Sequence, residues 1–426
     1  MKRSRLLHLS VLSLALIGTA SLAGQATDWP SFRGPHGNGM TQETGFPLEW
    51  STTKNVRWKL ELPNRGNESP IVSNGRVFVT SADDKGTERR LHCVDRKTGD
   101  LIWTKSVSID DEEATHQTNP FGAATPAATG KRVVVWHGSA GLFCYDFDGN
   151  ELWNRDLGNV GHIWGYGSSP VIHGDRVFLN FGPGDEQFMV AVSLRDGEIL
   201  WRFDEPGGND DRQGRMVGSW STPVIAEVDG ATQLICSMPT RVVSLSPDAG
   251  SLLWSCAGVS GKNGDLVYTS PLIGKGFGIA MGGYTGPALA FRLDSSASGD
   301  VTKSHRLWHD EQKHPQRIGS GVILGNHIFM ANAGPGILQC LDATTGKELW
   351  KDRGSGANHW GSIVFADDRL YVTNQKGTTV VFAPNAEEFE SLAENPLGEP
   401  SNSTPAFSDG EIFIRTSGHL WCIAEK

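Results

Sequence analysis

An all-β fold, an eight-bladed β-propeller built of four-stranded antiparallel blades, is predicted by three features of this 426-residue sequence. These are a pattern that occurs five times, eight regularly spaced strand starts, and an unpaired strand near the N-terminus. In each copy of the pattern a Gly precedes a Trp by four residues, as in Leu341–Trp350. Fixed spacing over many copies indicates an internal repeat. The five pairs are Gly99/Trp103, Gly149/Trp153, Gly197/Trp201, Gly250/Trp254 and Gly346/Trp350.

Eight small-residue markers, each leading into an apolar strand, place the starts of the repeats. Within a repeat, two short strands joined by a turn such as Asn74-Gly75 precede a third strand, and the Thr-Gly turn leads to a fourth strand that carries the Trp. Four short strands in about 47 residues are typical of a propeller blade. The markers are Ser69-Pro70, Thr125-Pro126, Ser169-Pro170, Thr222-Pro223, Ser270-Pro271, Ser320-Gly321, Ser362-Ile363 and Thr404-Pro405.

The two ends of the chain are expected to close the ring. The eighth repeat stops at its third strand, Trp421-Cys422-Ile423, and the strand Asn55–Leu62 with Trp58 would supply the fourth. Closure of this kind removes exposed sheet edges. Two repeats are irregular: Trp308 follows Gly299 by nine residues in the fifth, and Phe389 is expected to replace the Trp of the seventh.

The first residues predict an export signal. A basic start is followed by the apolar run Leu6–Ile17 and then by small residues, which is the build of a cleavable signal peptide rather than of a membrane anchor. We therefore expect a signal peptide over 1–26, a loop-like strap over 27–54 and the propeller over 55–426. The product would be a soluble, exported monomer, periplasmic or extracellular, with no transmembrane segment after signal removal.

The net charge argues against a nucleic-acid-binding protein, and the cysteine positions argue against a disulfide-rich scaffold. The formal net charge of −10 would repel phosphate backbones and anionic membranes, so no nucleic-acid partner is expected. The six cysteines do not form a disulfide framework, because Cys93, Cys144, Cys340 and Cys422 occupy one position of four different repeats. Cys236 and Cys256 fall on the second and fourth strands of one repeat, too far apart to bond. We expect six free, mostly buried thiols.

The recurring tryptophans are interpreted as packing between adjacent blades, because residues that recur identically around a ring do not converge on one site. Burial of one indole stabilises the fold by about 2–3 kcal/mol. Their Asp partners, such as Asp95 and Asp342, are expected to accept turn amides. The set assigned to this packing is Trp58, Trp103, Trp153, Trp201, Trp254, Trp308 and Trp350.

The pattern Ala-x-Asp-x-x-Thr-Gly-x-x-x-Trp resembles the tryptophan-docking motif of the pyrroloquinoline-quinone (PQQ) repeat. Leu341–Trp350 and Val94–Trp103 match it closely, whereas repeats three and four have Ser193 and Ser246 in place of the Asp. The resemblance covers nearly all of the chain after the leader. It implies an exported quinoprotein-like propeller, a family that includes the propeller lipoprotein of the outer-membrane β-barrel assembly machinery. The opening Trp29–Pro35 is typical of one branch of non-enzymatic members.

Residues outside the repeat pattern indicate where a site could be. The connections from the fourth strand of one blade to the first strand of the next are long, and their aromatic and charged residues differ from blade to blade. Such residues on one face are what a recognition surface requires, although they could also only fill the channel mouth. The candidates are Glu68, His116, Asn119, His162, Trp164, Tyr166, Asp211, Arg215, Trp220, Tyr268, Arg317, Asn358, His359 and Trp360.

Two functions remain open from the sequence. A PQQ- and calcium-dependent alcohol or sugar dehydrogenase would need an aromatic floor, such as Trp220 or Trp164, and oxygens from Glu68, Asn119, Asp211 and Asn358 around Ca²⁺. The adjacent Cys-Cys pair of the alcohol-oxidising members and a haem-attachment motif are both missing from the sequence. We therefore favour a non-catalytic scaffold that binds a protein or another envelope partner, with no catalytic residue, no metal and no cofactor expected.

Overall fold

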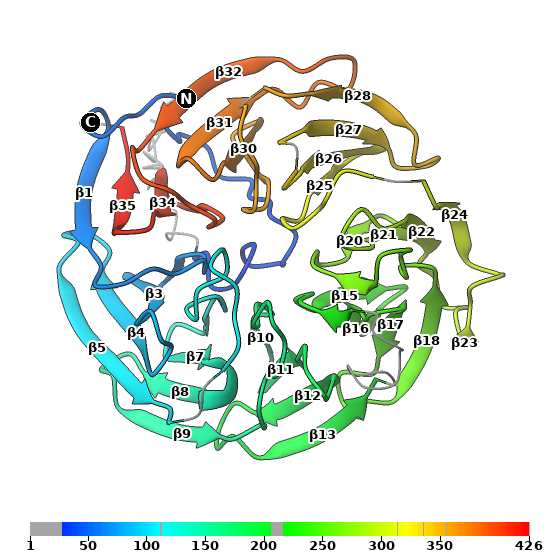
Figure 1. Cartoon of the computed structure of the whole chain (residues 1–426), viewed down its shortest axis with the longest axis horizontal. Coiled ribbons are helices and arrows are strands. Elements are labelled where there is room, and N and C mark those ends of the chain that lie inside the picture. The colour runs from blue at the N-terminus through cyan, green and yellow to red at the C-terminus, as the bar shows by residue number, and fades with distance from the viewer. Residues whose placement is uncertain are drawn as a thin grey trace, which may run out of the picture.

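The computed structural model describes residues 28–110, 113–205, 216–312, 314–334, 336–354 and 356–425. Its strands form eight blades around a central axis, which confirms the predicted eight-bladed propeller (Figure 1). The expected signal peptide lies outside the described residues. The described part contains one short 3₁₀ helix, η1 (Gly138–Ala140), and no helix there has the length and apolarity needed to span a bilayer.

The first four blades follow the chain in order. Blade 1 consists of β2 (Ile71–Ser73), β3 (Arg76–Ala82), β4 (Glu88–Asp95) and β5 (Leu101–Ser108). Blade 2 consists of β6 (Ala127–Ala128), β7 (Arg132–Trp136), β8 (Leu142–Asp146) and β9 (Glu151–Arg155). Blade 3 consists of β10 (Val171–His173), β11 (Arg176–Phe181), β12 (Phe188–Ser193) and β13 (Ile199–Asp204). Blade 4 consists of β15 (Val224–Val228), β16 (Ala231–Ser237), β17 (Arg241–Leu245) and β18 (Leu252–Ala257).

The other four blades complete the ring. Blade 5 consists of β20 (Leu272–Gly274), β21 (Phe277–Met281), β22 (Ala288–Arg292) and β24 (Arg306–Asp310). Blade 6 consists of β25 (Val322–Leu324), β26 (His327–Ala331), β27 (Leu338–Asp342) and β28 (Glu348–Asp352). Blade 7 consists of β29 (Val364–Ala366), β30 (Arg369–Thr373), β31 (Thr378–Phe382) and β32 (Ser391–Pro396). Blade 8 consists of β33 (Ala406–Ser408), β34 (Glu411–Arg415), β35 (His419–Ile423) and β1 (Val56–Glu61).

Blade 8 closes the ring as the sequence predicted. Strand β1 pairs antiparallel with β35, and Trp58 lies opposite Cys422. The two ends of the propeller domain thus share one sheet, and in Figure 1 the blue strand β1 lies beside the red strands of the C-terminus.

Three short strands depart from the blade plan. β14 (Val217–Ser219) and β19 (Asp265–Val267) pair with each other in parallel, outside the blades, in the connections that lead into blades 4 and 5. β23 (Gly299–Asp300) comes from the long turn of blade 5 and adds to the edge of β18 in blade 4. The sequence pattern predicted none of these pairings.

Six indoles each join one blade to the next one, at six of the eight boundaries between blades. In blade 8, the indole nitrogen of Trp58 donates to the carbonyl of Arg96 in blade 1 over 2.8 Å. A Cβ added to Gly99 would lie 2.6 Å from the Trp58 ring, so this position needs glycine both for its positive φ and for the close approach of the indole. The same hydrogen bond, at 2.9–3.0 Å, is made to the next blade by Trp103, Trp153, Trp201, Trp308 and Trp350.

In blades 4 and 7 the residue at the Trp position does not make this hydrogen bond to the next blade. Trp254 donates instead to the Gln233 side chain of its own blade, because blade 5 replaces the usual turn with a longer one. The expectation for Phe389 is wrong. Ala393, opposite Val381, occupies the register position of the missing Trp, whereas Phe389 packs against Trp350 of the preceding blade.

The strap crosses the propeller and binds several blades. The Asp28 carboxylate accepts hydrogen bonds from Ser73 and Asn74, in the turn between the first two strands of blade 1. At the other end of the strap, the Gly45 amide donates to Asp367, in the corresponding turn of blade 7. Figure 1 shows this blue segment running across the middle of the ring. The strap therefore lies on the face that carries these turns.

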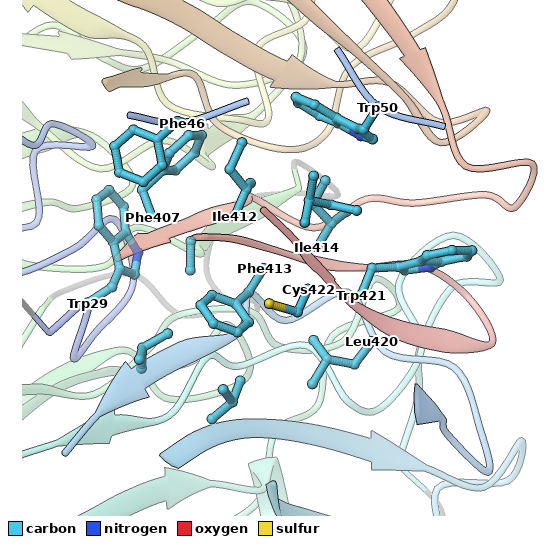
Figure 2. Close-up of a cluster of buried hydrophobic side chains, with 14 of the residues drawn as sticks. Trp29, Phe46, Trp50, Phe407, Ile412, Phe413, Ile414, Leu420, Trp421 and Cys422 are labelled. Atoms are coloured by element: carbon cyan, nitrogen blue, oxygen red, sulfur yellow. The ribbon is translucent and has the colours of Figure 1, made fainter. Parts of the chain in front are cut away.

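Aromatic side chains fasten the strap to blade 8. Trp29 and Phe46 pack on Phe407 with ring centroids 6.1 and 5.0 Å away, as seen in Figure 2. Trp50 stacks on Tyr371 with an interplanar angle of 15° and belongs to the same buried cluster that Ala393 contacts. An aromatic residue of the strap thus packs where blade 7 lacks its own Trp.

The two markers that lack Pro, Ser320-Gly321 and Ser362-Ile363, take part in contacts of their own. The carbonyl of Gly321 accepts a hydrogen bond from the buried Arg33 guanidinium, and the Ile363 amide donates to the Ser320 carbonyl over 3.0 Å. A proline at position 363 could not donate that bond. Burial lowers the pKa of Arg33 to about 9.

All six cysteines are free and buried, as predicted. Cys236 lies on β16 and Cys256 on β18, the second and fourth strands of blade 4. Burial raises the pKa of Cys93, Cys144, Cys236, Cys340 and Cys422 to about 12 and that of Cys256 to about 11.

Candidate functional site

The two faces of the propeller carry different loops. Because neighbouring strands of a blade are antiparallel, connections from strand four to the next blade and connections from strand two to strand three open on one face, which we call the loop face. The turns between strands one and two open on the opposite face, where the strap lies. A ligand that reaches the channel from the loop face would therefore meet both kinds of loop.

A belt of Ser and Thr hydroxyls surrounds the channel at the start of the innermost strands. The Ser69 amide donates to the Thr125 hydroxyl over 2.9 Å, and the Thr404 amide donates to the Ser69 hydroxyl over 3.1 Å. Five further bonds of this type, at 2.8–3.0 Å, continue from blade to blade. The small residue of every marker except Ser270 thus satisfies a buried amide of the preceding blade. The belt consists of Ser69, Thr125, Ser169, Thr222, Ser270, Ser320, Ser362 and Thr404.

A cavity of about 360 Å³ lies on the axis at this belt. Seven of the eight belt residues line it, all except Ser270, and Phe32 of the strap also reaches it. Its aromatic walls come from loops of several blades: Trp164, Trp220, Tyr268, Tyr284 and Trp360. This volume is at the lower end of the range found for small-molecule sites.

The small parallel ladder positions two of these rings. Strand β14 ends at Ser219 and β19 at Val267, and the amide of Trp220 continues the ladder by donating to the Val267 carbonyl over 2.8 Å. Trp220 and Tyr268 follow directly, so their ring centroids lie 5.2 Å apart. The indole nitrogen of Trp220 is fixed by a 2.8 Å hydrogen bond to the Gly165 carbonyl.

Trp164 is held from two sides. The Asn119 side-chain amide donates to the Trp164 carbonyl over 2.8 Å, and the Trp164 amide donates to Nδ1 of His162 over 3.1 Å. Its ring stacks on Tyr284 with centroids 5.8 Å apart and an interplanar angle of 11°. His162 packs edge-on against Trp220 at 4.9 Å, and burial lowers its pKa to about 4.

Side-chain amides from blade 7 and from the connections that lead into blades 8, 1 and 2 form a chain of hydrogen bonds at the rim. The Asn67 amide donates to Asn119 over 3.2 Å, the Asn402 amide donates to Asn67 over 3.2 Å, and Gln375 donates to Asn402 over 3.0 Å. Gln316, from the connection that leads into blade 6, also lines the cavity. Apart from the imidazole of His116, the polar side chains of the described wall are thus amides, hydroxyls and indole N–H groups.

The structure divides the sequence-predicted candidates into three groups. Those that line the cavity are His116, Asn119, Trp164, Trp220, Tyr268 and Trp360. Those that are buried outside the lining are Glu68, His162, Tyr166, Arg317 and His359, whereas Asn358 is exposed and also outside it. Asp211 and Arg215 lie outside the described residues.

Glu68 illustrates why a buried candidate does not act at the surface. Its carboxylate lies 3.3 Å from the Arg415 guanidinium, and both side chains are fully buried. It also accepts a 3.1 Å hydrogen bond from the Thr80 amide. Burial raises the pKa of Glu68 to about 7 against the opposing effect of Arg415. The pair joins blades 1 and 8 and does not line the cavity.

Sequence reasoning missed several lining residues. Tyr284 lies in the loop between the second and third strands of blade 5, and only connections between blades had been considered. Phe32 belongs to the strap, whose path across the channel is a tertiary feature. The belt residues were identified only as strand starts, although their recurrence in all eight repeats was a visible signal.

The described lining does not match the ligand set of a PQQ–calcium site. No Asp, Glu, Lys or Arg is found among the described residues that line the cavity. Calcium requires several oxygen ligands, usually including carboxylates, and the quinone itself is an anion that needs cationic or hydrogen-bonding partners. In the described ranges, no group of three or more His, Cys, Asp or Glu is arranged as a metal site.

Comparison with known families agrees with the fold and the repeat. A family model described as outer membrane protein assembly factor BamB matches residues 87–352 and 334–424, which together are well over half of the chain. The chain belongs to this family. The matched ranges include most of the blades and most of the residues that line the axial cavity.

Relatives of this BamB-type chain include both an outer membrane protein assembly factor and alcohol dehydrogenases. It is 23% identical over 310 residues to the quinohemoprotein alcohol dehydrogenase of Comamonas testosteroni, with 59% of this chain and 42% of that protein covered. It is 22% identical over 231 residues to BamB of Yersinia pestis, with 52% and 50% covered. The chain thus spans about half the length of these relatives or less.

The solved structures that resemble this chain also include both kinds of protein. BamB of Moraxella catarrhalis superposes with a TM-score of 0.60 at 13% identity, covering 86% of this chain and 98% of that one. The quinohemoprotein alcohol dehydrogenase of Comamonas testosteroni superposes with a TM-score of 0.66 at 14% identity, covering 94% and 81%. Likeness at this identity shows the shared propeller fold and does not distinguish the two functions.

Proposed function

We propose that this protein is an exported, non-catalytic binding module that presents its loop face to a partner of the cell envelope. The observation that carries the proposal is the axial cavity, whose aromatic walls come from several blades and whose described lining contains no Asp, Glu, Lys or Arg. Such a site can hold a ligand by shape, stacking and hydrogen bonding. It offers no described carboxylate as a base and no described metal ligand set.

The fixed positions of the aromatic side chains at the rim support a binding role. Trp220 is fixed by the Gly165 carbonyl, and Trp164 is fixed by Asn119 and by its stack on Tyr284. Preformed aromatic anchors lose little conformational entropy on binding, which favours recognition. The family description, an assembly factor of the outer membrane, is consistent with a binding role in the envelope.

The second candidate is a PQQ- and calcium-dependent dehydrogenase. The tryptophans beside an axial cavity favour it, since they could form an aromatic floor for the quinone. It would need its anionic and cationic ligands from residues outside the described lining, such as the candidates Asp211 and Arg215. For this reason we rank it below the binding module.

Position-dependent crosslinking in the native envelope tests the proposal. A photoreactive side chain at Ile163, which is 57% exposed on the loop face, should give a defined adduct. The matched control is the same group at Lys275, which is exposed on the opposite face in the turn between β20 and β21. Adducts from Lys275 alone, or none from Ile163, would contradict a loop-face partner.

A further inference from the structure

The described lining of the axial cavity consists mainly of aromatic rings, hydroxyls and side-chain amides, with one imidazole, His116, and no Asp, Glu, Lys or Arg. Aromatic rings form its rim, and the hydroxyl belt forms its inner wall. A ligand that suits both must present apolar C–H faces to the rings and several oxygens to the hydroxyls. This combination is the chemistry of a sugar ring, whose C–H groups are attracted to the negative face of an aromatic ring.

The hydroxyl protons of the belt residues are hydrogen-bond donors that the described residues do not use. The hydroxyl oxygens of Ser69 and Thr125, for example, each accept an amide of the preceding blade. In the described part of the chain, none of the seven lining belt hydroxyls donates its own proton to a protein acceptor, so seven O–H donors remain for water or for a ligand.

Three polar groups at the rim also have a hydrogen-bond donor that the described protein does not use. The indole nitrogen of Trp164 and the hydroxyls of Tyr268 and Tyr284 donate no hydrogen bond to another described residue, although all three side chains line the cavity. The rings themselves are packed against one another, with Trp164 and Tyr268 at 6.3 Å. Fixed rings with unused polar tips can stack on a ligand and donate to its oxygens at the same time.

Other ligand classes fit this lining less well. An anion would find no Lys or Arg among the described lining residues, and an apolar ligand would leave the belt hydroxyls without partners. A peptide strand that pairs through its backbone needs free backbone amides. At the belt, the amides of residues such as Ser169 and Ser320 are already bonded to hydroxyls of the next blade.

We propose that the axial cavity binds a neutral saccharide unit, stacked on the rim tryptophans and bonded to the hydroxyl belt, as a ligand that is not oxidised. This inference rests on the proposed function and names its ligand class. The cavity volume of about 360 Å³ limits the bound part to one end or a short stretch of a glycan.

Saturation-transfer NMR and tryptophan emission with defined probes test the proposal. The probes are glucose, N-acetylglucosamine and their β-1,4-linked tetramers, with a galacturonate tetramer and a neutral octapeptide as competing classes. We expect one of the neutral saccharides to bind and to change the tryptophan emission. Binding of the galacturonate or the peptide alone would overturn the saccharide inference and leave the binding-module function standing.

Matched variants localise the binding. Trp164→Ala should weaken it at least about fivefold through loss of stacking, and Tyr268→Phe, which keeps the ring, about two- to tenfold through loss of one hydroxyl. Lys275→Ala, in the turn between β20 and β21 on the opposite face, is the control and should leave affinity unchanged. Equal affinity in wild type, Trp164→Ala and Tyr268→Phe would place the saccharide elsewhere and overturn the inference, as would a lack of binding by every neutral saccharide. Calcium-dependent quinone binding in the cavity would instead overturn the proposed function itself.

Discussion

The amide of Thr404 donates to the hydroxyl of Ser69 over 3.1 Å, and this single bond joins the last blade to the first across 335 positions of sequence. Both residues are almost fully buried and line the axial cavity. The same contact therefore closes the ring and forms part of the candidate site. The belt residues therefore have two roles, because their hydroxyls both satisfy buried amides and face the channel.

Replacing Ser69 by Ala should destabilise the protein by about 1–3 kcal/mol, because the buried Thr404 amide would lose its acceptor. Chemical denaturation measures the change in the free energy of unfolding. Ser270→Ala is the matched control, since no hydrogen bond to the Ser270 hydroxyl is found in the described structure and this residue does not line the cavity. Equal effects of the two changes would show that the belt bonds do not contribute measurably.

Docking of the indoles predicts a strong dependence on glycine in the neighbouring turn. Gly250 has φ of 66°, and an added Cβ would meet the Trp201 ring at 2.5 Å. Gly299 has the same φ of 66° but no atom within 4 Å of an added Cβ. Gly250→Ala should therefore cost about 1–3 kcal/mol more than Gly299→Ala, since both changes strain the backbone but only one crowds an indole. Similar melting temperatures for the two variants would argue against indole docking as the joint between blades.

The thiols should be inert in the folded protein. Burial raises the pKa of five of them to about 12 and of Cys256 to about 11, and thiolate is the reactive form. A thiol reagent at pH 8 should label none of the six in native buffer and all six in denaturant. Rapid labelling of the native protein, or fewer than six thiols after unfolding without reductant, would contradict the buried, unpaired state.

Acid should destabilise the fold between pH 6.5 and pH 4. Burial lowers the pKa of His92 and His359 to about 4 and that of His137 to about 3, so these groups favour folding above pH 6.5 and this stability is lost as pH falls. Each contributes at most on the order of 3 kcal/mol. Denaturant titrations across this range should show proton uptake on unfolding.

Glu68 changes the stability of the fold with pH in the opposite direction from the buried histidines. Its folded pKa of about 7 lies above its ordinary value, so its contribution to stability decreases as pH rises from about 4.5 to 7. Glu68→Gln should remove this compensation and make the loss of stability on acidification steeper than in the wild type. An identical pH dependence in the two proteins would mean that the Glu68 carboxyl is not perturbed.

The repeat made most of the fold predictable. Gly and Trp at a fixed spacing report one local geometry, the indole of one blade on the turn of the next, so the blade count and the closing strand could be derived from the sequence. Trp254 and Ala393 could not be predicted, because their surroundings depend on the turn of blade 5 and on Trp50 of the strap. A residue at one register position can thus take different partners.

The candidate site was predictable in part. Residues of the connections between blades, such as Trp164 and Trp220, do line the cavity. Glu68 does not, because its partner Arg415 comes from the opposite end of the chain and no local pattern indicates their contact. Tyr284 was missed because antiparallel strands bring a loop within a blade to the same face as the loops between blades.

A titration of the purified protein with PQQ and Ca²⁺ by calorimetry and absorbance tests the central claim most directly. Among the described residues, the lining offers no Lys or Arg to the anionic quinone and no carboxylate to Ca²⁺. The account therefore predicts no binding at high micromolar quinone, with or without Ca²⁺. Tight, Ca²⁺-dependent binding that is lost on Trp220→Ala and kept in Ile163→Ala would contradict it and make the dehydrogenase the better account.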